Sequence, residues 1–399
     1  MRNEWWVYLI GILVVVGGLA IGAHTFRQKS REKRVEQQIA QIESLQSENR
    51  YDEALAQIEA LAPRVRDVAT QNRLERLAIQ ILMRAQKTDE ARKRAEAYLQ
   101  AYPDDRHLGM IHYVLGKIAL EQENNRQKAG QHFETVITKY SNDPSSAGAL
   151  LGLANLDVSV DILSAKKRLD ELTEMPLDRD LRSSVESLLG QVNTAILYSR
   201  NLLPGDQFYD VKQGDAPIHI AKRFHVETDL ILQCNNIKDP KLLRAGRRIK
   251  IPKVDFSILV NIGDNTLTLL NEGKFFKKYR VRTGRFSGLT PTGQFKIEDK
   301  QENPQWEDPE TGKIYKRGAP DNELGTRWLK FDHPGLGIHG TIHPESIGTY
   351  ASKGCIGMLK QDVEELYGLV PRGTLVTIIG ERPKTTYSAT ELTSETKRP

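Results

Sequence analysis

The sequence predicts a multidomain protein: a transmembrane helix, an all-α helical-repeat region, a small β-α-α-β module and a β-rich C-terminal domain. Three features of the pattern lead to this fold class. An uncharged stretch runs from Trp5 to Phe26, helical spacing of apolar residues runs from 31 to about 200, and a period of two begins at Phe256. The chain has 399 residues, too many for a single hydrophobic core. We expect a membrane anchor, helical repeats, the module, the β-rich domain and a disordered tail at 1–30, 31–200, 207–253, 254–381 and 382–399.

The N-terminal stretch is long enough to cross a bilayer as a helix. Trp5 and Trp6 at its start suit a membrane interface. A cleaved signal peptide is the alternative, but the preceding residues carry only Arg2, offset by Glu4, and small-residue cleavage sites are weak. We therefore favour an uncleaved anchor.

The charges that flank this stretch favour the opposite orientation. Five basic residues follow it, at positions 27, 29, 31, 33 and 34. The positive-inside rule would keep the C-terminal part in the cytoplasm, although long domains translocate regardless of flanking charge. We nevertheless expect that part to lie outside the cytoplasm, in the periplasm or cell wall, because of the chemistry predicted below.

The helical region contains a weak repeat. The alanines of its recurring motif are 37, 38 and 36 residues apart, at Ala54, Ala91, Ala129 and Ala165. This period resembles tetratricopeptide-like helix pairs, in which small residues let the helices approach and stacked neighbours share a core. Two interpretations remain open: a surface that binds a partner protein, or a spacer that lifts the C-terminal domains off the membrane.

The module follows a linker at 201–206. Its pattern predicts a short strand with a Gly-Asp turn, helices at 218–224 and 229–236, and a strand that ends at Pro252. It resembles a LysM domain, which implies binding to N-acetylglucosamine-containing glycans. Cys234 shares a helical face with Leu230 and Ile231, so we expect it in the core rather than in a second reactive site.

The β-rich domain begins with two strands, at 256–262 and 266–270. A third strand, 275–283, alternates two sets of residues: Phe275, Lys277, Tyr279 and Val281 on one side and Lys278, Arg280 and Arg282 on the other. Near the end, we expect a helix at 361–369 and a closing strand at 375–379.

Candidate chemistry centres on Cys355, one of two cysteines in the chain. His339 lies 16 residues upstream, and a histidine can take the thiol proton or hold the thiolate as an ion pair. Gly354 permits a tight turn whose N–H groups converge on an oxyanion. A structural cysteine and an ordinary loop histidine are the alternative.

The surrounding motifs resemble the L,D-transpeptidase (YkuD-type) catalytic domain. The likeness covers about 125 residues, from roughly 255 to 380. Its motifs occur in the expected order: TPTG (290–293), NP (303–304), NELGTRW (322–328), HGT (339–341), SKGCI (352–356) and PRGTLVTI (371–378).

The resemblance implies a role for each residue type. Cys355 would be the nucleophile, His339 the general base, Gly340 the residue that orients the imidazole, and Gly354 an oxyanion donor. We assign substrate binding to Ser352, Lys353, Arg327 and Trp328. Neither a cofactor nor a metal is implied, and His343 is expected to be a loop residue.

The chain departs from the family pattern beside the nucleophile. Gly357 stands where the family usually has an arginine, and a glycine cannot replace a guanidinium. Arg282, Arg285 or Arg327 could supply the missing charge. Lys353 either lowers the thiol pKa or is a solvated surface lysine, the reading we favour. The stretch 301–323 is either a lid over the cleft or an insertion.

We therefore expect a membrane-anchored enzyme that acts on peptidoglycan stem peptides, while its LysM module holds glycan strands. Attack by Cys355 on a diaminopimelate carbonyl and resolution by a second stem amine would give a 3–3 cross-link. The alternatives are an L,D-carboxypeptidase with the same site and a non-catalytic wall-binding scaffold. The net charge of +5 comes without an aromatic-interleaved basic stripe, so we expect no nucleic-acid partner.

Overall fold

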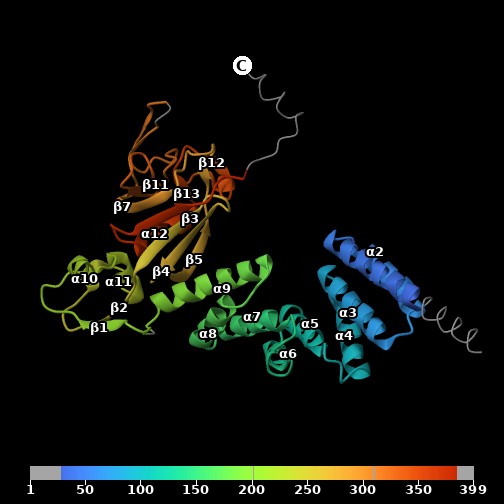
Figure 1. Ribbon diagram of the computed structural model, residues 1–399. Helices are drawn as coiled ribbons and strands as arrows, with labels where there is room; N and C mark the ends of the chain where they lie inside the picture. Colours follow the sequence, from blue (N-terminus) through green and yellow to red (C-terminus); the bar gives the residue numbers. More distant parts are fainter. Residues whose placement is uncertain (1–27, 201, 309–310, 384–399) are drawn as a thin grey trace, which may run out of the picture. The chain divides into compact units, whose positions relative to one another are not determined.

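The computed structural model describes residues 28–200, 202–308 and 311–383, which form two compact units that divide after Leu156 (Figure 1). The predicted membrane span at Trp5–Phe26 and the predicted tail from residue 384 onward lie outside these ranges. Within them, no helix combines the length and apolar character needed to cross a bilayer.

The N-terminal unit consists of helices joined by short turns. Residues 28–47 are helical. The elements that follow are α2 (Tyr51–Leu61), η1 (Ala62–Arg64), α3 (Val68–Arg84), α4 (Thr88–Ala101), α5 (Leu108–Glu121), α6 (Arg126–Lys139) and α7 (Ser146–Asp157). Ala54, Ala91 and Ala129 are fully buried on α2, α4 and α6, as small residues at helix contacts should be.

Phe133 explains two glycines in this unit. A Cβ at Gly116 or at Gly152 would lie 2.5 or 2.6 Å from the Phe133 ring. The ring, 1% exposed, therefore fills space that only glycine leaves open on α5 and α7.

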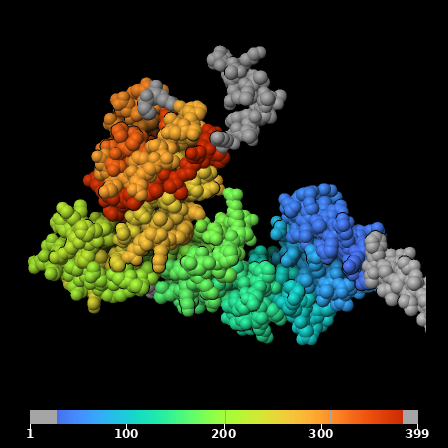
Figure 2. Space-filling model, viewed as in Figure 1, coloured from blue at the N-terminus to red at the C-terminus, as the bar shows by residue number. Residues whose placement is uncertain are grey.

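The C-terminal unit begins with two further helices, α8 (Ile162–Thr173) and α9 (Arg179–Tyr198). Ala165 of α8 is fully buried, like its counterparts in the first unit. The side chain of Asn193 donates to the Phe276 carbonyl (2.9 Å), and Glu186 pairs with Lys278. The green part of the surface adjoins the yellow part in Figure 2, in agreement with the contacts between α9 and β5. The last helices of the predicted repeat region belong to the same unit as the β-rich domain.

The small module has the predicted order of elements. These are β1 (Gln207–Asp210), α10 (Pro217–Phe224), α11 (Thr228–Cys234), η2 (Pro240–Leu242) and β2 (Arg248–Ile251), with β1 and β2 antiparallel. Cys234 is 1% exposed beside buried Leu230 and Ile231, which confirms the core position.

A buried lysine joins the module to α9. Lys250 on β2 pairs with Asp206 at 3.2 Å, and both side chains are at most 3% exposed. The Lys250 ammonium also donates to the carbonyls of Leu197 (3.3 Å) and Ser199 (3.2 Å). A cation at the C-terminal end of α9 satisfies carbonyls that lack helical partners.

The β-rich domain is built on one large sheet. Among the described residues, eight strands follow the order β13-β11-β10-β7-β14-β3-β4-β5. They are β3 (Phe256–Asn261), β4 (Thr266–Asn271), β5 (Lys274–Arg280), β7 (Gly293–Glu302), β10 (Arg327–Phe331), β11 (Gly337–Gly340), β13 (Ile356–Met358) and β14 (Leu375–Ile379). The smaller elements are β6 (Thr283–Gly284), β8 (Trp306–Glu307), β9 (Ile314–Tyr315), η3 (Pro344–Ser346), β12 (Tyr350–Ser352) and the helix α12 (Lys360–Leu369).

The alternation predicted for the third strand is wrong in two places. Phe276, not Phe275, is buried, because an irregularity in the β4–β5 pairing leaves Phe276 without a partner between Lys277 and Phe275. Arg282, which the predicted alternation places on one side with Lys278 and Arg280, is only 6% exposed. The strand ends at Arg280, so the period of two no longer governs Arg282.

Lys300 ties the module to the β-rich domain. Its ammonium donates to the carbonyls of Tyr367 and Val370 at the end of α12, both at 2.7 Å. It also pairs with Glu227 of the module at 2.9 Å. Helix α9, the module and the domain are therefore connected through buried or half-buried charges.

Candidate active site

Strand pairing brings the predicted base and nucleophile to neighbouring positions. β11 and β13 are parallel, and His339 lies opposite Gly357, two residues after Cys355. His339 and the segment that follows Cys355 thus come to adjacent strands of one sheet. Cys355 itself lies in the loop just before β13.

The His339 ring is oriented by its own backbone. His339 is 4% exposed, and its Nδ1 hydrogen-bonds to the carbonyl of Gly340. If Nδ1 carries the proton for this bond, Nε2 is left as an acceptor for a thiol proton. This is the contact that the sequence assigned to Gly340.

Cys355 is partly exposed, and its thiol donates to the carbonyl of Gly335 at 3.2 Å. Burial raises the pKa of the thiol to about 11, opposed by a backbone hydrogen bond from Gly337 and by the charge of Arg282. For His339, burial and then Arg282 lower the pKa to about 3, against hydrogen bonds to the backbone of Gly340 and Glu323. At neutral pH the resting site therefore holds a neutral thiol and a neutral imidazole, not an ion pair.

Ser352 stabilises the loop that carries Cys355, residues 352–355, which is called the nucleophile loop below. This residue is 4% exposed, and its hydroxyl donates to the carbonyl of Cys355 (2.6 Å) and accepts from Gly354 N–H (3.2 Å). Gly354 has φ +135°, and a Cβ there would lie 2.8 Å from the Leu289 carbonyl oxygen, so only glycine fits. In this state Ser352 faces the loop, and Gly354 N–H already has an acceptor.

The Lys353 side chain contacts the neighbouring hairpin, β8–β9. Its ammonium pairs with Asp308 at 2.6 Å and lies 5.6 Å from the centre of the Trp306 ring. The Asp308 side chain is 7% exposed. The interpretation of Lys353 as a solvated surface lysine is therefore wrong, because a buried carboxylate holds it. The β8–β9 hairpin, within the stretch 301–323, is attached to the nucleophile loop through this pair.

The two remaining predicted substrate residues lie on β10. Trp328 is opposite His339 in the sheet, and its ring lies 6.0 Å from the imidazole and covers Gly337. The Arg327 guanidinium donates to the Thr326 carbonyl and stacks 5.1 Å from the Tyr367 ring. Trp328 thus packs beside the imidazole, whereas the Arg327 guanidinium contacts Thr326 and Tyr367 instead.

The sequence did not single out Arg282 from the other arginines, and the structure separates them. Arg285 lies over the Phe286 ring, whereas the Arg282 side chain lies against Gly357. The departure at Gly357 was the signal in the sequence that pointed to a relocated arginine.

Comparison with known proteins identifies the family. Residues 255–378 match the L,D-transpeptidase catalytic domain (YkuD), and residues 209–252 match the LysM domain. The chain is 40% identical over 179 residues to the Bacillus subtilis protein YkuD, named as an L,D-transpeptidase; the match covers 43% of this chain and 97% of that protein. The chain belongs to the L,D-transpeptidase family. This is a family of cysteine-dependent enzymes that act on peptidoglycan.

More distant relatives carry the same description. YcfS of Escherichia coli K12, named as an L,D-transpeptidase, is 30% identical over 204 residues. The match covers 45% of this chain and 63% of YcfS. Among solved structures, the catalytic domain of the E. faecium L,D-transpeptidase is 26% identical to this chain. The match covers 31% of this chain and 97% of that domain, with a TM-score of 0.27.

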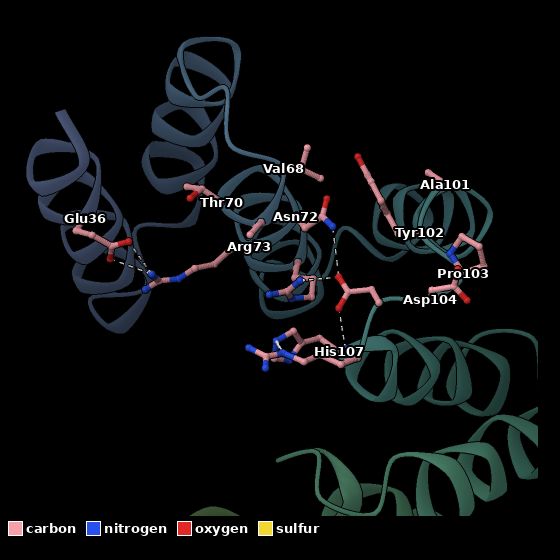
Figure 3. A pocket seen from close by; sticks show the side chains of 14 residues that line it. Glu36, Val68, Thr70, Asn72, Arg73, Ala101, Tyr102, Pro103, Asp104 and His107 are labelled. Atoms are coloured by element: carbon pink, nitrogen blue, oxygen red, sulfur yellow. Dashed lines mark hydrogen bonds and ion pairs between the residues drawn. The ribbon is translucent and has the colours of Figure 1, made fainter. Parts of the chain in front are cut away.

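The N-terminal unit of the transpeptidase contains a separate groove of about 750 Å³, shown in Figure 3. Two of its three arginines are in ion pairs, Arg73 with Glu36 and Glu43 and Arg76 with Asp105, and the third, Arg106, donates to His107 Nε2. In the part of the chain that the structure describes, no cluster of three or more His, Cys, Asp or Glu side chains could hold a metal ion.

Proposed function

We propose that this chain is a peptidoglycan L,D-transpeptidase with Cys355 as nucleophile and His339 as general base. The observation that carries the proposal is the parallel pairing of β11 and β13, with His339 opposite Gly357, two residues beyond the cysteine. The hydrogen bond from the imidazole to Gly340 supports the same role, because it leaves Nε2 as the proton acceptor.

The reaction proceeds by two acyl transfers. His339 Nε2 takes the thiol proton, and the sulfur attacks the diaminopimelate carbonyl of a tetrapeptide stem. The C–N bond breaks, D-alanine leaves with the proton from His339, and a thioester remains on Cys355. The amine of a second stem then attacks the thioester, His339 takes its proton, and the thiol is regenerated with a 3–3 cross-link formed.

Donors for the oxyanion come from the backbone around the nucleophile. We propose Gly354 and Cys355 N–H, each worth about 3 kcal/mol of barrier. In the resting structure Gly354 N–H donates to the Ser352 hydroxyl. When substrate binds, this N–H would have to leave the hydroxyl and donate to the oxyanion instead. Substrate contacts from Ser352, Lys353, Arg327 and Trp328 belong to the same proposal.

The remaining parts of the chain hold the enzyme at the wall. The LysM module binds glycan strands, and residues 1–30 anchor the chain, with the catalytic domain outside the cytoplasm. Helix pairs from 31 to 200 form a tetratricopeptide-like region. Lys300 supports joint action of module and domain, because it bonds to both.

The test uses the full chain, purified in detergent, with disaccharide-tetrapeptide muropeptides and analysis of products by mass spectrometry. Dimers with a 3–3 bond are expected from the wild type and not from Cys355→Ser. Tripeptide without dimer would replace the transferase with a carboxypeptidase. No product, together with no adduct at Cys355 after a carbapenem is added, would leave only a wall-binding scaffold.

A further inference from the structure

Arg282 is a buried cation without a matching anion. Its residue is 6% exposed, and Nε is fully buried with no hydrogen-bond partner. Its side-chain contact is a hydrogen bond from Nη1 to the Ser346 hydroxyl at 3.3 Å, and no described carboxylate lies within 4.0 Å of it. A buried charge that is left unpaired in the resting protein is expensive, which argues for a use elsewhere in the cycle.

Gly357 provides the space in which Arg282 lies. The two residues exchange backbone hydrogen bonds of 2.9 and 3.0 Å. A Cβ at Gly357 would be 2.4 Å from Arg282 Nε and 2.6 Å from its Cγ. The Gly357 backbone does not have a positive φ. Space for the arginine, not an unusual backbone conformation, therefore requires glycine two residues after the nucleophile.

The groups that act on Arg282 come from every side of the site. They are Glu323 before β10, Cys355 before β13 and Glu345 on η3, and all three oppose the effect of burial, which lowers the Arg282 pKa. Arg282 in turn acts on both Cys355 and His339. The other nearby cation, Lys353, is already held by Asp308.

We propose that Arg282 stabilises the Cys355 thiolate from the neighbouring chain segment, and that Gly357 is the notch that lets it do so. The inference rests on the proposed function, in which the thiol proton moves to His339 Nε2. The negative charge left on Sγ then interacts electrostatically with the guanidinium, which lies against Gly357 two residues further on. The same charge disfavours a protonated imidazole, so His339 stays available as a base. Arg282 is a positioning residue, because it acts through the sulfur.

The experiment measures alkylation of Cys355 in the full chain by iodoacetamide, with peptide mapping to separate it from Cys234. Iodoacetamide is neutral and lacks a carboxylate, so its rate reports the thiolate fraction and not substrate binding. We expect Arg282→Gln to move the rate profile up by about one pH unit or more, that is, about tenfold slower at any pH below the plateau. Arg282→Lys should retain most of the rate.

A double variant protects the test against loss of the fold. In Arg282→Gly/Gly357→Arg the charge enters the same space from the other side of the bridge, so we expect the alkylation rate to recover relative to Arg282→Gly. Gly357→Arg alone puts two side chains in one space and should slow alkylation. No recovery in a folded double variant would count against the proposal.

Other outcomes separate this inference from the proposed function. A profile for folded Arg282→Gln that coincides with the wild type would overturn it, and a raised KM for muropeptide with unchanged kcat would then assign Arg282 to the substrate carboxylate. A wild type that makes no product while Arg282→Gln still shifts alkylation would refute the proposed function and keep the inference.

Discussion

Cys234 and Cys355 are both held in surroundings that raise their thiol pKa, yet they differ in what surrounds the sulfur. Burial raises the pKa of Cys234 to about 12 and that of Cys355 to about 11. Each has a cation nearby, Lys250 or Arg282. Lys250 is already neutralised by Asp206 and by backbone carbonyls, whereas Arg282 has no anion in ion-pair range. A cation beside a thiol indicates a catalytic role only when no carboxylate already pairs with that cation.

The comparison also separates two kinds of thiol hydrogen bond. Cys234 donates to the Leu197 carbonyl at 3.0 Å inside the core shared by α9 and the module. Cys355 donates to Gly335 in a partly exposed loop with an imidazole on the adjacent strand. One bond completes a packed junction, and the other holds a thiol in the loop before β13, the strand that pairs with β11 and its His339.

The largest expected effect comes from replacing the two cysteines one at a time. Cys355→Ser should lower the rate of cross-link formation on the order of 10³-fold or more, because a neutral hydroxyl replaces an activatable thiol. Cys234→Ala is the matched control and should leave kcat unchanged. Both are measured by mass spectrometry of muropeptide products. A comparable loss in folded Cys234→Ala would mean that the two cysteines are not functionally distinct.

The second effect concerns the cation next to Cys234. Lys250→Met leaves the buried Asp206 carboxylate with backbone N–H donors but without its cation, and should destabilise the junction of α9 and the module by about 3–5 kcal/mol. Urea unfolding with pulsed alkylation of Cys234 follows this junction directly. Lys253→Met, which removes an exposed pair with Glu272, is the control and should cost at most about 1 kcal/mol. Equal midpoints for the two variants would show that the Lys250 pair contributes no stability.

The third effect is the pH dependence of alkylation. Because the pKa of Cys355 is raised, the thiol is protonated below it, and the rate should climb about tenfold per pH unit from 7 toward 10. An exposed cysteine peptide, with a pKa near 8.5, should level off about two units earlier. Cys234 should stay unlabelled while the module is folded. A plateau for Cys355 near pH 7 would instead indicate a thiolate–imidazolium pair at rest.

Much of the C-terminal half could be predicted from the sequence, because its signals are local. The closing strand Leu375–Ile379 has its predicted bounds, and α12 begins one residue early, at Lys360. The buried faces of Cys234 and of the repeated alanines follow from helical spacing. His339 and Cys355 were paired by motif; the structure places His339 on β11 opposite Gly357 of β13, two residues after Cys355, and the catalytic roles of the two residues stay a prediction.

What the sequence could not give depends on contacts between distant segments. Phe276 replaced Phe275 in the core because of a bulge that depends on the partner strand. Arg282 is buried because Gly357, 75 residues later, leaves space for its side chain. Lys353 was misread because its partner, Asp308, is 45 residues away in a hairpin with no strong pattern of its own. The bond of Lys300 to Glu227 likewise joins two predicted domains whose contact no motif encodes.

The smallest effect concerns the hairpin that Lys353 holds. Lys353→Met removes the 2.6 Å pair and leaves Asp308 without this cation, so the β8–β9 hairpin should open more often. We expect KM for muropeptide to rise about three- to tenfold with a smaller change in kcat, and cleavage by a protease within 301–323 to speed up. Lys313→Met removes an exposed pair within the same hairpin and is the control. Unchanged KM and unchanged proteolysis would make the stretch an insertion rather than a lid. If kcat and the alkylation rate of Cys355 both fell, Lys353 would act on the sulfur as Arg282 does. A cation that is already in an ion pair would then also affect a thiol, and the contrast between Lys250 and Arg282 would not hold in general.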